Sequence, residues 1–568
     1  MQDPSGKFTR RSIVRGISAA ALLPLLSANL TGCSDSNNRD KGVAASFEHG
    51  VASGDPLTDR VILWTRATPE EEGAVLLDWE IALDEAFAEV VASGRGETTA
   101  DVDYTFKVDA DGLDAGTAYF YRFRCREVES PIGRTRTAPA GSVPAATFAV
   151  VSCANFPAGY FNVYREVAGR EVDAVLHLGD YIYEYGADSY ASEQAEAIGR
   201  VSDPAHEIIT LADYRRRYAQ YRGDGDLQAC HARHPFILVW DDHEIADNTW
   251  REGAANHDPA TEGAFSERRA AAIQAWYEWL PVRPPAEARE IIYRRFSYGD
   301  LLDLLMLDTR NIGRDLQLDY ADFTNGDLID VEALRAAVND SNRSMLGAEQ
   351  LAWLEGALTE STARWQVLGQ QVLMARLALP EPIISGLNSG ALGAATSALL
   401  AAVSAKNTPE EQRSAEQQAL LDSAIPLNLD AWDGYAFERE ALLQHAAQLA
   451  SRLVVLAGDT HNAWGSQLTT AAGDIVGVEI AAPSVTSPGA EAAIGATNAA
   501  LFGSVVTTLV DDLGYANLIN RGYLEVGFAP EALEARWRFV DTIDSVDYSI
   551  DAAAEKVVSV QRSDLVLN

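Results

Sequence analysis

Basic residues are scarce in this chain of 568 residues. It carries 45 Lys and Arg against 83 Asp and Glu, which gives a formal net charge of −38. Such a charge repels nucleic acid and anionic bilayers and keeps a protein soluble, so the composition argues against a polyanion-binding protein and fits a saline setting. Any site for an anionic ligand would need local cations to reverse this field.

Cysteine is also rare, with four in the chain: Cys33, Cys125, Cys153 and Cys230. An oxidising compartment would permit a disulfide between Cys125 and Cys230, but nothing in the sequence requires one. The chain also has no internal repeat and no glycine-rich phosphate loop of the Walker type. The absence of that loop counts against a nucleotide-driven machine.

The apolar stretch near the start of the chain is short. It covers about residues 17–26, which is too few to span a membrane. The preceding segment 9–15 contains Arg10 and Arg11 and is typical of a twin-arginine export signal. We therefore expect export by the twin-arginine machinery to the periplasm or the cell surface.

The apolar stretch is followed by Leu30-Thr31-Gly32-Cys33, which resembles a lipoprotein signal box. This predicts that residues 1–32 are removed and that Cys33 becomes the acylated first residue, with residues 33–46 as a polar stalk. The removal takes away four basic residues and one acidic residue and moves the net charge from −38 to −41. The alternative is a conventional cleaved signal in which Cys33 is incidental.

The texture of the sequence changes near residues 138–144, which predicts two domains. Residues 47–140 contain short alternating segments separated by Gly- and Asp-rich turns, the pattern of a small β-sandwich. In residues 141–568, strands alternate with helical stretches such as 267–280. The predicted fold class is therefore α/β, a two-layered mixed-sheet sandwich preceded by a small β-sandwich domain.

Residues 379–426, approximately, are rich in Ala, Ser, Gly and Leu and have no strong strand character. This composition predicts an insertion in the second domain. A long segment of this kind is either a lid or substrate-binding element, or an inert surface helix.

Four segments share one design, in which a short apolar run ends in residues that bind metals. The runs are 147–151, 172–178, 236–240 and 452–457, and they lead to Cys153, to Asp180, to Asp242 and His243, and to Asp459 and His461. Such runs are typical of strands buried on both faces, and in α/β sheets ligands collect past the carboxyl ends of the strands. The four ends are expected to converge, which predicts a multi-metal hydrolase.

The residue types at these ends favour particular metals. Cys153 as thiolate, Tyr183 as phenolate and His461 as imidazole suit a Lewis-acidic transition ion such as iron. Asp180 could bridge to a second centre, where Asp242 and Asp459 offer only hard oxygen and favour calcium or magnesium over zinc.

Several candidates also have a purely structural interpretation. A lone cysteine after an apolar strand, such as Cys153, is usually a small buried hydrophobe. His177 lies inside an apolar run and is expected to be a hydrogen-bonded core residue. The histidines in polar segments are expected to be solvated: His231, His234 and His257.

The motifs as a set, in their order and spacing, resemble those of the PhoD-like alkaline phosphatases and phosphodiesterases, which are calcium- and iron-dependent calcineurin-like metallophosphoesterases. The resemblance covers most of the chain. It rests on the segments 51–56, 61–66, 152–155, 179–183, 241–244, 307–310, 432–435 and 458–461.

The resemblance implies roles for individual residues. It assigns Cys153, Asp180, Tyr183 and His461 to Fe3+, and it places Asp180, Asp242 and Asp459 at Ca2+. It also implies that His243 and Asn155 contact the phosphate, and that His243 and Asp180 take part in catalysis. In the wider metallophosphoesterase pattern, an Asp stands at the position of Cys153 and a His at that of Asp459, and these departures argue against a zinc or manganese centre. A further ligand is expected near Gln370 or Gln371, where the wider pattern has a His.

The implied activity is metal-dependent hydrolysis of phosphate monoesters or diesters, with a role in phosphate acquisition and no nucleic-acid partner. Two alternatives stay open at this point. One is a phospholipase D-like phosphodiesterase, which the resemblance also permits. The other is a non-catalytic, lipid-anchored binding protein that uses the β-sandwich as its interaction module.

Overall fold

The computed structural model describes residues 42–568 apart from 287–288 and 326–327. The predicted signal 1–32, Cys33 and most of the stalk 33–46 lie outside the described residues. Within the described part of the chain, no helix combines the length and the apolar character that a membrane crossing requires.

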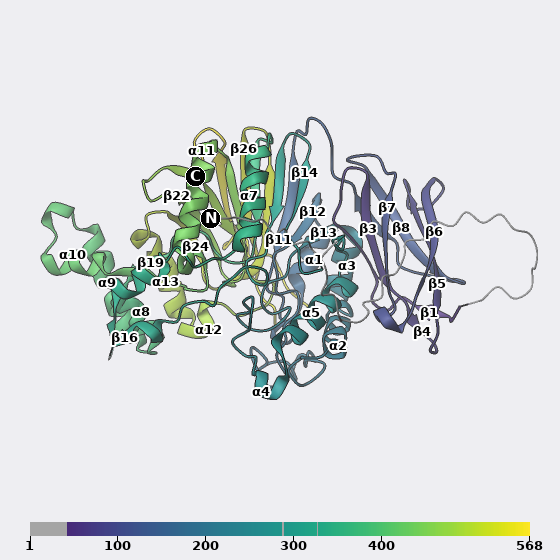
Figure 1. Cartoon of the computed structure of the whole chain (residues 1–568), viewed down its shortest axis with the longest axis horizontal. Helices are drawn as coiled ribbons and strands as arrows, with labels where there is room; N and C mark the ends of the chain where they lie inside the picture. Colours follow the sequence, from purple (N-terminus) through teal and green to yellow (C-terminus); the bar gives the residue numbers. More distant parts are fainter. Residues whose placement is uncertain (1–41, 287–288, 326–327) are drawn as a thin grey trace, which may run out of the picture. The chain divides into compact units, whose positions relative to one another are not determined.

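A nine-stranded sheet and a seven-stranded sheet form the two layers of the fold (Figure 1). The first has the strand order β27 (Lys556–Gln561), β26 (Ala532–Val540), β25 (Arg521–Phe528), β11 (Ala146–Val151), β12 (Ala174–His177), β13 (Pro235–Leu238), β2 (Val51–Gly54), β3 (Arg60–Arg66) and β7 (Thr105–Asp111). The second has the order β14 (Arg294–Tyr298), β15 (Leu302–Met306), β18 (Trp365–Gly369), β21 (Leu453–Ala457), β23 (Ile475–Ala481), β22 (Ala463–Thr469) and β24 (Leu513–Asn517).

The main hydrophobic core lies between these two sheets. Val150 and Leu176 of the nine-stranded sheet belong to the same buried cluster as Val454 and Ile480 of the seven-stranded sheet. In both sheets parallel and antiparallel strands pair side by side. The predicted fold class, a two-layered mixed-sheet α/β sandwich, is confirmed.

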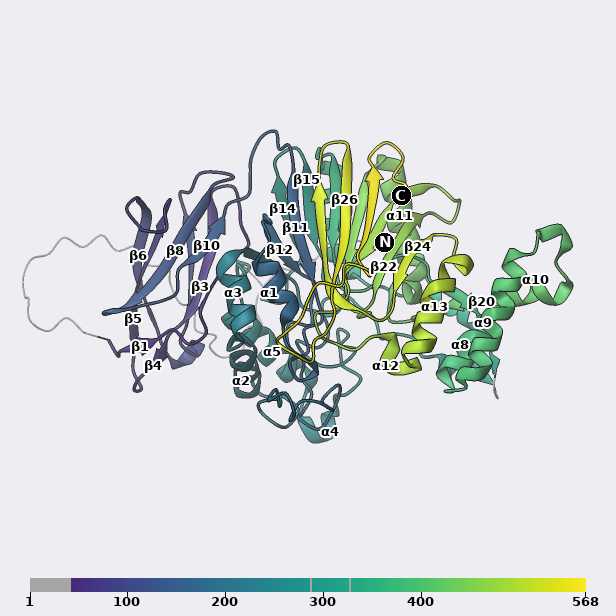
Figure 2. The same cartoon turned by 180° about the vertical axis from the view of Figure 1, so that it is seen from behind.

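Helices cover the outer faces of the sheets (Figures 1 and 2). On the nine-stranded sheet, α1 (Asn162–Ala168) packs on β25, and α3 (Gly225–Arg233) packs on β13. On the other side, α11 (Ala436–Leu449) contacts β23 and α7 (Gly347–Glu360).

Besides the two-stranded pair of β1 (Ala45–Ser46) and β4 (Thr68–Pro69), the N-terminal region contributes strands to two larger sheets. A five-stranded sheet contains β5 (Val75–Ala82), β6 (Val90–Thr98), β8 (Ala118–Cys125), β9 (Val128–Glu129) and β10 (Gly133–Arg136). It shares a core with β3 and β7, as the cluster of Leu63, Leu77, Phe106 and Phe123 shows, so a β-sandwich is present. However, β2 pairs in parallel with β13, so one layer of this sandwich continues the sheet of the second domain. The sequence did not indicate that connection.

The segment predicted as an insertion leaves and returns at one place. Its ends pair as β19 (Ala378–Pro380) and β20 (Ala424–Pro426), with α8 (Glu381–Asn388), α9 (Leu392–Asn407) and α10 (Ala415–Asp422) between them (Figure 2). The insertion is anchored because Leu399 of α9 shares a buried cluster with Phe502 of α13 (Ala496–Leu509).

Candidate metal centre

The ends of β11, β12, β13 and β21 converge, as the sequence predicts. Three overlapping groups have one ligand atom per residue within 4.8 Å of one another. These groups are Cys153, Asp180 and His461; then Asp180, Asp242 and His243; and then Asp241, Asp242 and Asp459. Asp180 is shared by the first two groups and Asp242 by the last two, so the three groups form one continuous site.

The backbone at this site adopts a conformation that side chains rarely allow. Cys153, Asp180, Asp459 and His461 have φ angles of 60°, 55°, 61° and 61°, in the left-handed region. Non-glycine residues in this region are uncommon and cluster at functional sites, where the surrounding structure maintains the strain. At the neighbouring Gly179, with φ of 104°, an added Cβ would lie 2.3 Å from Cβ of Asp241. The turn after β12 therefore has room only for glycine.

His461 and Tyr183 meet on the side of the site that contains Cys153. Nδ1 of His461 lies 2.7 Å from the carbonyl oxygen of Pro488, so it carries the proton and leaves Nε2 as the ligand atom. Nε2 lies 3.2 Å from the hydroxyl oxygen of Tyr183. That hydroxyl donates to Oδ2 of Asp180 at 2.8 Å and accepts from Oγ of Ser487 at 2.6 Å.

The thiol of Cys153 and the phenol of Tyr183 are deeply buried, with exposures of 0% and 1%. Burial first, and the charge of Asp180 second, raise the pKa of both groups well above their usual values. Both groups would therefore be anions only beside a strong cation.

Arg310 lies among the carboxylates on the other side of the site. Its guanidinium binds Asp241 and Asp459 at 2.5 and 2.6 Å. Burial is the main cause that raises the pKa of Asp459 to about 7, and the positive charge of Arg310 opposes that rise. The sequence motif that contains Arg310 contributed to the family resemblance, but it gave no sign that this side chain reaches the metal ligands.

Buried carboxylate oxygens at the centre fit a cation. Oδ1 of Asp180 and Oδ2 of Asp241 have no hydrogen-bond partner among the described residues. An unpaired buried carboxylate is costly unless a cation binds it. The thiol, phenol and imidazole lie together, and the carboxylates lie together, so the donor set suits one softer and one harder cation.

Glu244 ties the strand ends together. Its carboxylate accepts hydrogen bonds from the backbone N–H groups of Asp180, Tyr181 and Asp241, at 3.0, 2.5 and 2.7 Å. Burial, followed by the charge of Asp180, raises its pKa to about 8. Sequence reasoning missed this role, because a Glu in a polar motif is normally read as exposed or as a ligand.

His243 is held by a second buried carboxylate that sequence reasoning missed. Its Nδ1 lies 2.8 Å from Oε2 of Glu184, which is 0% exposed. Glu184 also accepts from the backbone N–H of Asp247 and the amide of Asn256, at 2.8 and 2.7 Å. Burial acts to lower the pKa of His243, but Asp242 and Glu184 overcome it and raise the pKa well above its usual value. The contact with Glu184 occupies Nδ1 and leaves Nε2 of His243 for a further contact.

The side chains of Asn155, Gln370 and Gln371 differ in whether their amide groups are already hydrogen-bonded within the protein. Asn155 is 1% exposed, and its amide nitrogen and oxygen have no hydrogen-bond partner in the described part of the chain, so both stay available. Gln371, in contrast, accepts from Thr309 and donates to two backbone carbonyls. Gln370 donates to the carbonyl of Val372 and accepts from Trp432. Both Gln side chains are thus occupied within the protein fold.

The expectation that three histidines are solvated is wrong. His231 and His234 are 0% exposed, and the side chain of His257 is 1% exposed. His231 lies on α3, where its ring stacks on Phe236 at 3.8 Å between centroids. The expectation for His177 is confirmed, since its Nε2 lies 2.8 Å from the hydroxyl of Tyr164. Cys125, Cys153 and Cys230 are all free thiols.

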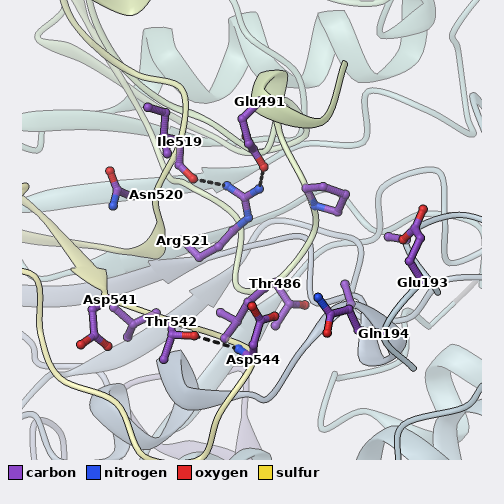
Figure 3. Close-up of a pocket in the computed structure, with 15 residues that line it drawn as sticks. Glu193, Gln194, Thr486, Glu491, Ile519, Asn520, Arg521, Asp541, Thr542 and Asp544 are labelled. Carbon is purple, nitrogen blue, oxygen red and sulfur yellow. Dashed lines mark hydrogen bonds and ion pairs between the residues drawn. The ribbon is translucent and has the colours of Figure 1, made fainter. Parts of the chain in front are cut away.

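A cavity of about 360 Å³ lies beside the loop of Pro488, the residue that contacts His461 (Figure 3). Pro488, whose carbonyl accepts from His461, lines this cavity together with Arg521 and Glu491. Arg521 forms an ion pair with Glu491 and donates to the carbonyl of Ile519 at 2.9 Å. This ion pair fixes the chain just after Pro488 and so supports the orientation of His461.

Two family models match successive parts of the chain. The family model described as PhoD-like phosphatase matches residues 148–537, and the one described as its N-terminal domain matches residues 32–139. Alkaline phosphatase D of Bacillus subtilis (strain 168) is 33% identical over 580 residues, which cover 98% of this chain and 89% of that protein. A solved structure described as PhoD matches with a TM-score of 0.76 at 32% identity, and 92% of each chain is covered.

Proposed function

Since this chain belongs to the PhoD-like phosphatase family and is a phosphoric ester hydrolase, we propose that it hydrolyses phosphate monoesters and diesters at a mixed iron–calcium centre. Cys153, Asp180, Tyr183 and His461 would hold the ferric ion. Asp180, Asp242 and Asp459 would hold calcium. The observation that carries this proposal is the overlap of the ligand groups, in which Asp180 is common to the thiol-containing group and to a carboxylate-containing one.

The protein's own residues supply positioning and a proton. When bound, the two kinds of ion polarise the phosphoryl oxygens and lower the pKa of a water molecule. His243, whose pKa is raised by Asp242 and Glu184, would bind a phosphoryl oxygen and donate a proton to the departing alkoxide. Glu184 holds Nδ1 of that ring, which makes Nε2 the donating atom. The unpaired amide of Asn155 is free to donate a hydrogen bond to the phosphate.

Metal analysis of the purified mature protein, combined with hydrolysis of an aryl phosphate monoester and the matching diester, tests this function. We expect iron and calcium to co-purify, calcium chelation to abolish turnover reversibly, and both esters to be cleaved. Full activity with zinc or manganese alone at full occupancy would contradict the proposed centre. Cleavage of the diester alone would favour a phospholipase D-like diesterase, which is the second candidate within the enzyme class.

We also propose that the protein is exported by the twin-arginine route and held at a membrane by a lipid on Cys33. The proposal is supported by the sequence pattern of residues 9–33 alone.

A further inference from the structure

Arg310 joins four carboxylates that come from three separate segments of the chain. Its side chain is 0% exposed. The guanidinium Nε lies 2.5 Å from Asp241, Nη1 lies 2.8 Å from Asp430, and Nη2 lies 2.6 Å from Asp459. Nη2 is also 3.8 Å from Asp242. All three nitrogens of the guanidinium are therefore engaged by carboxylate oxygens.

Three of these carboxylates, those of Asp241, Asp242 and Asp459, form one of the ligand groups. Arg310 binds Oδ1 of Asp241, and Oδ2 of the same residue is buried without a partner in the described part of the chain. In the same way, only Oδ1 of Asp459 is bound by Arg310. A planar guanidinium that grips one oxygen of each carboxylate fixes the direction of the other.

Like charges at such short separations also need a counter-charge. The side chains of Asp241, Asp242 and Asp459 are 0%, 6% and 16% exposed, so water screens their mutual repulsion poorly. Arg310 supplies a permanent positive charge among them, because guanidinium does not lose its proton in proteins.

We propose that Arg310 is a positioning residue that acts as a resident counter-cation, which keeps the carboxylates of Asp241, Asp242 and Asp459 together and aimed before calcium binds. Calcium then enters a site that is already formed. The inference rests on the proposed calcium site, to which Asp242 and Asp459 belong as ligands and beside which Asp241 lies, and it concerns how that site survives without its ion.

Arg314, a little further along the chain, provides a matched control. It is equally buried, at 0% exposure, and it also forms an ion pair with Asp430. It also contacts the carbonyls of Thr309 and Asp430, Sδ of Met345 and the ring of Tyr435. No contact with Asp241, Asp242 or Asp459 is found among the described residues. Loss of Arg314 removes a buried arginine but leaves the ligand carboxylates paired with Arg310.

The experiment compares the melting temperatures of wild type, Arg310→Met and Arg314→Met, each in a calcium chelator and in excess calcium. We expect both variants to melt below wild type in the chelator. Calcium should restore most of the loss in Arg310→Met, because the ion replaces the missing charge, but little of the loss in Arg314→Met. Equal responses of the two variants to calcium would overturn the inference. So would an Arg310→Met protein that stays unfolded in calcium while Arg314→Met folds.

Arg310→Lys separates orientation from charge, because lysine keeps the charge but cannot bridge three carboxylates. We expect this variant to bind calcium roughly ten- to a hundredfold more weakly than wild type in a calorimetric titration. Unchanged affinity would rule out the orienting role. If the proposed function is wrong, the wild type itself should show no calcium binding. If the wild type binds calcium, the role of Arg310 is decided by whether calcium restores the melting temperature of Arg310→Met.

Discussion

The ring nitrogen Nδ1 of His461 lies 2.7 Å from the carbonyl oxygen of Pro488, and this contact fixes the tautomer of the histidine. The other ring nitrogen, Nε2, is thereby left to face Tyr183 at 3.2 Å. Metal-binding histidines commonly donate their second N–H in this way. The arrangement makes His461 and Tyr183 neighbours in the proposed iron ligand set, and this relationship can be tested by spectroscopy.

Tyr183→Phe should remove or strongly alter a visible absorption band of the resting enzyme. Charge transfer from a phenolate to a ferric ion produces such a band, and calcium has no d electrons to do so. Calcium binding should persist in the variant, because only the iron loses a ligand. The matched control is Tyr190→Phe, whose hydroxyl lies 3.3 Å from Nδ1 of His461 and so faces the ring nitrogen opposite the proposed ligand atom Nε2. Identical spectra of iron-loaded wild type and Tyr183→Phe would show that Tyr183 is not a ligand.

Cys153→Ala should lower activity at least a hundredfold or so, in the range expected when a metal site is disrupted. The loss of unfolding free energy should stay near 1 kcal/mol, typical of a small buried truncation. Cys230→Ala is the control, because Cys230 is equally buried but lies outside the centre. The measurements are turnover, iron content and chemical denaturation. A fully active Cys153→Ala enzyme would restore the interpretation of this residue as a small buried hydrophobe.

The sequence predicted those site residues that belong to a local pattern, and it missed those whose role depends on residues far away in the sequence. Continuous apolar runs ending in Cys153, Asp180, Asp242 and Asp459 are local patterns, and parallel strands bring such ends to one edge. The residues that hold the ligands gave no such signal. Glu184, Glu244 and Arg310 look like ordinary polar residues of loops, and their roles depend on partners that lie 59 to 149 residues away.

The same limit applies to the fold. Strand positions such as β3 and β25 follow from alternating or apolar runs, whereas the pairing of β2 with β13 joins segments that no local pattern relates. The prediction that His231 and His234 are solvated was wrong for a related reason. Polar neighbours on α3 suggested exposure, but the ring of His231 faces the sheet and stacks on Phe236.

Cys33→Ala should release the protein from membranes or leave its signal unprocessed. The reason is that acylation at Cys33 would provide the anchor, and the apolar stretch of residues 17–26 is too short to span a membrane in its place. Fractionation of the cells and mass spectrometry of the mature N-terminus are the measurements. A wild-type protein found free outside the cytoplasm, with a mature start other than Cys33, would refute the anchor.

His243→Ala should retain both metals and lose roughly two to four orders of magnitude in kcat, because it removes a transition-state contact together with a proton donor. Metal content and steady-state kinetics on an aryl phosphate monoester check this outcome. Loss of metal from the variant would instead make His243 a ligand.

Glu184→Gln should shift the pH profile without removing the ring of His243. In the wild type, Asp242 and Glu184 raise the pKa of His243, so the protonated ring persists into alkaline solution and activity falls only as the pH rises through that raised pKa. A neutral glutamine has nearly the same shape and keeps one oxygen that can accept from Nδ1 of His243, but it removes one negative charge and one accepting oxygen. The pKa of His243 should fall, and the alkaline limb of the kcat profile should move to lower pH, while metal content stays unchanged.

The control is Glu207→Gln, since Glu207 is an ion-pair partner of Arg268 and not of His243. An alkaline limb at the same pH in Glu184→Gln and wild type would show that this limb does not report the proton of His243, and the acid role assigned to that residue would have to be withdrawn.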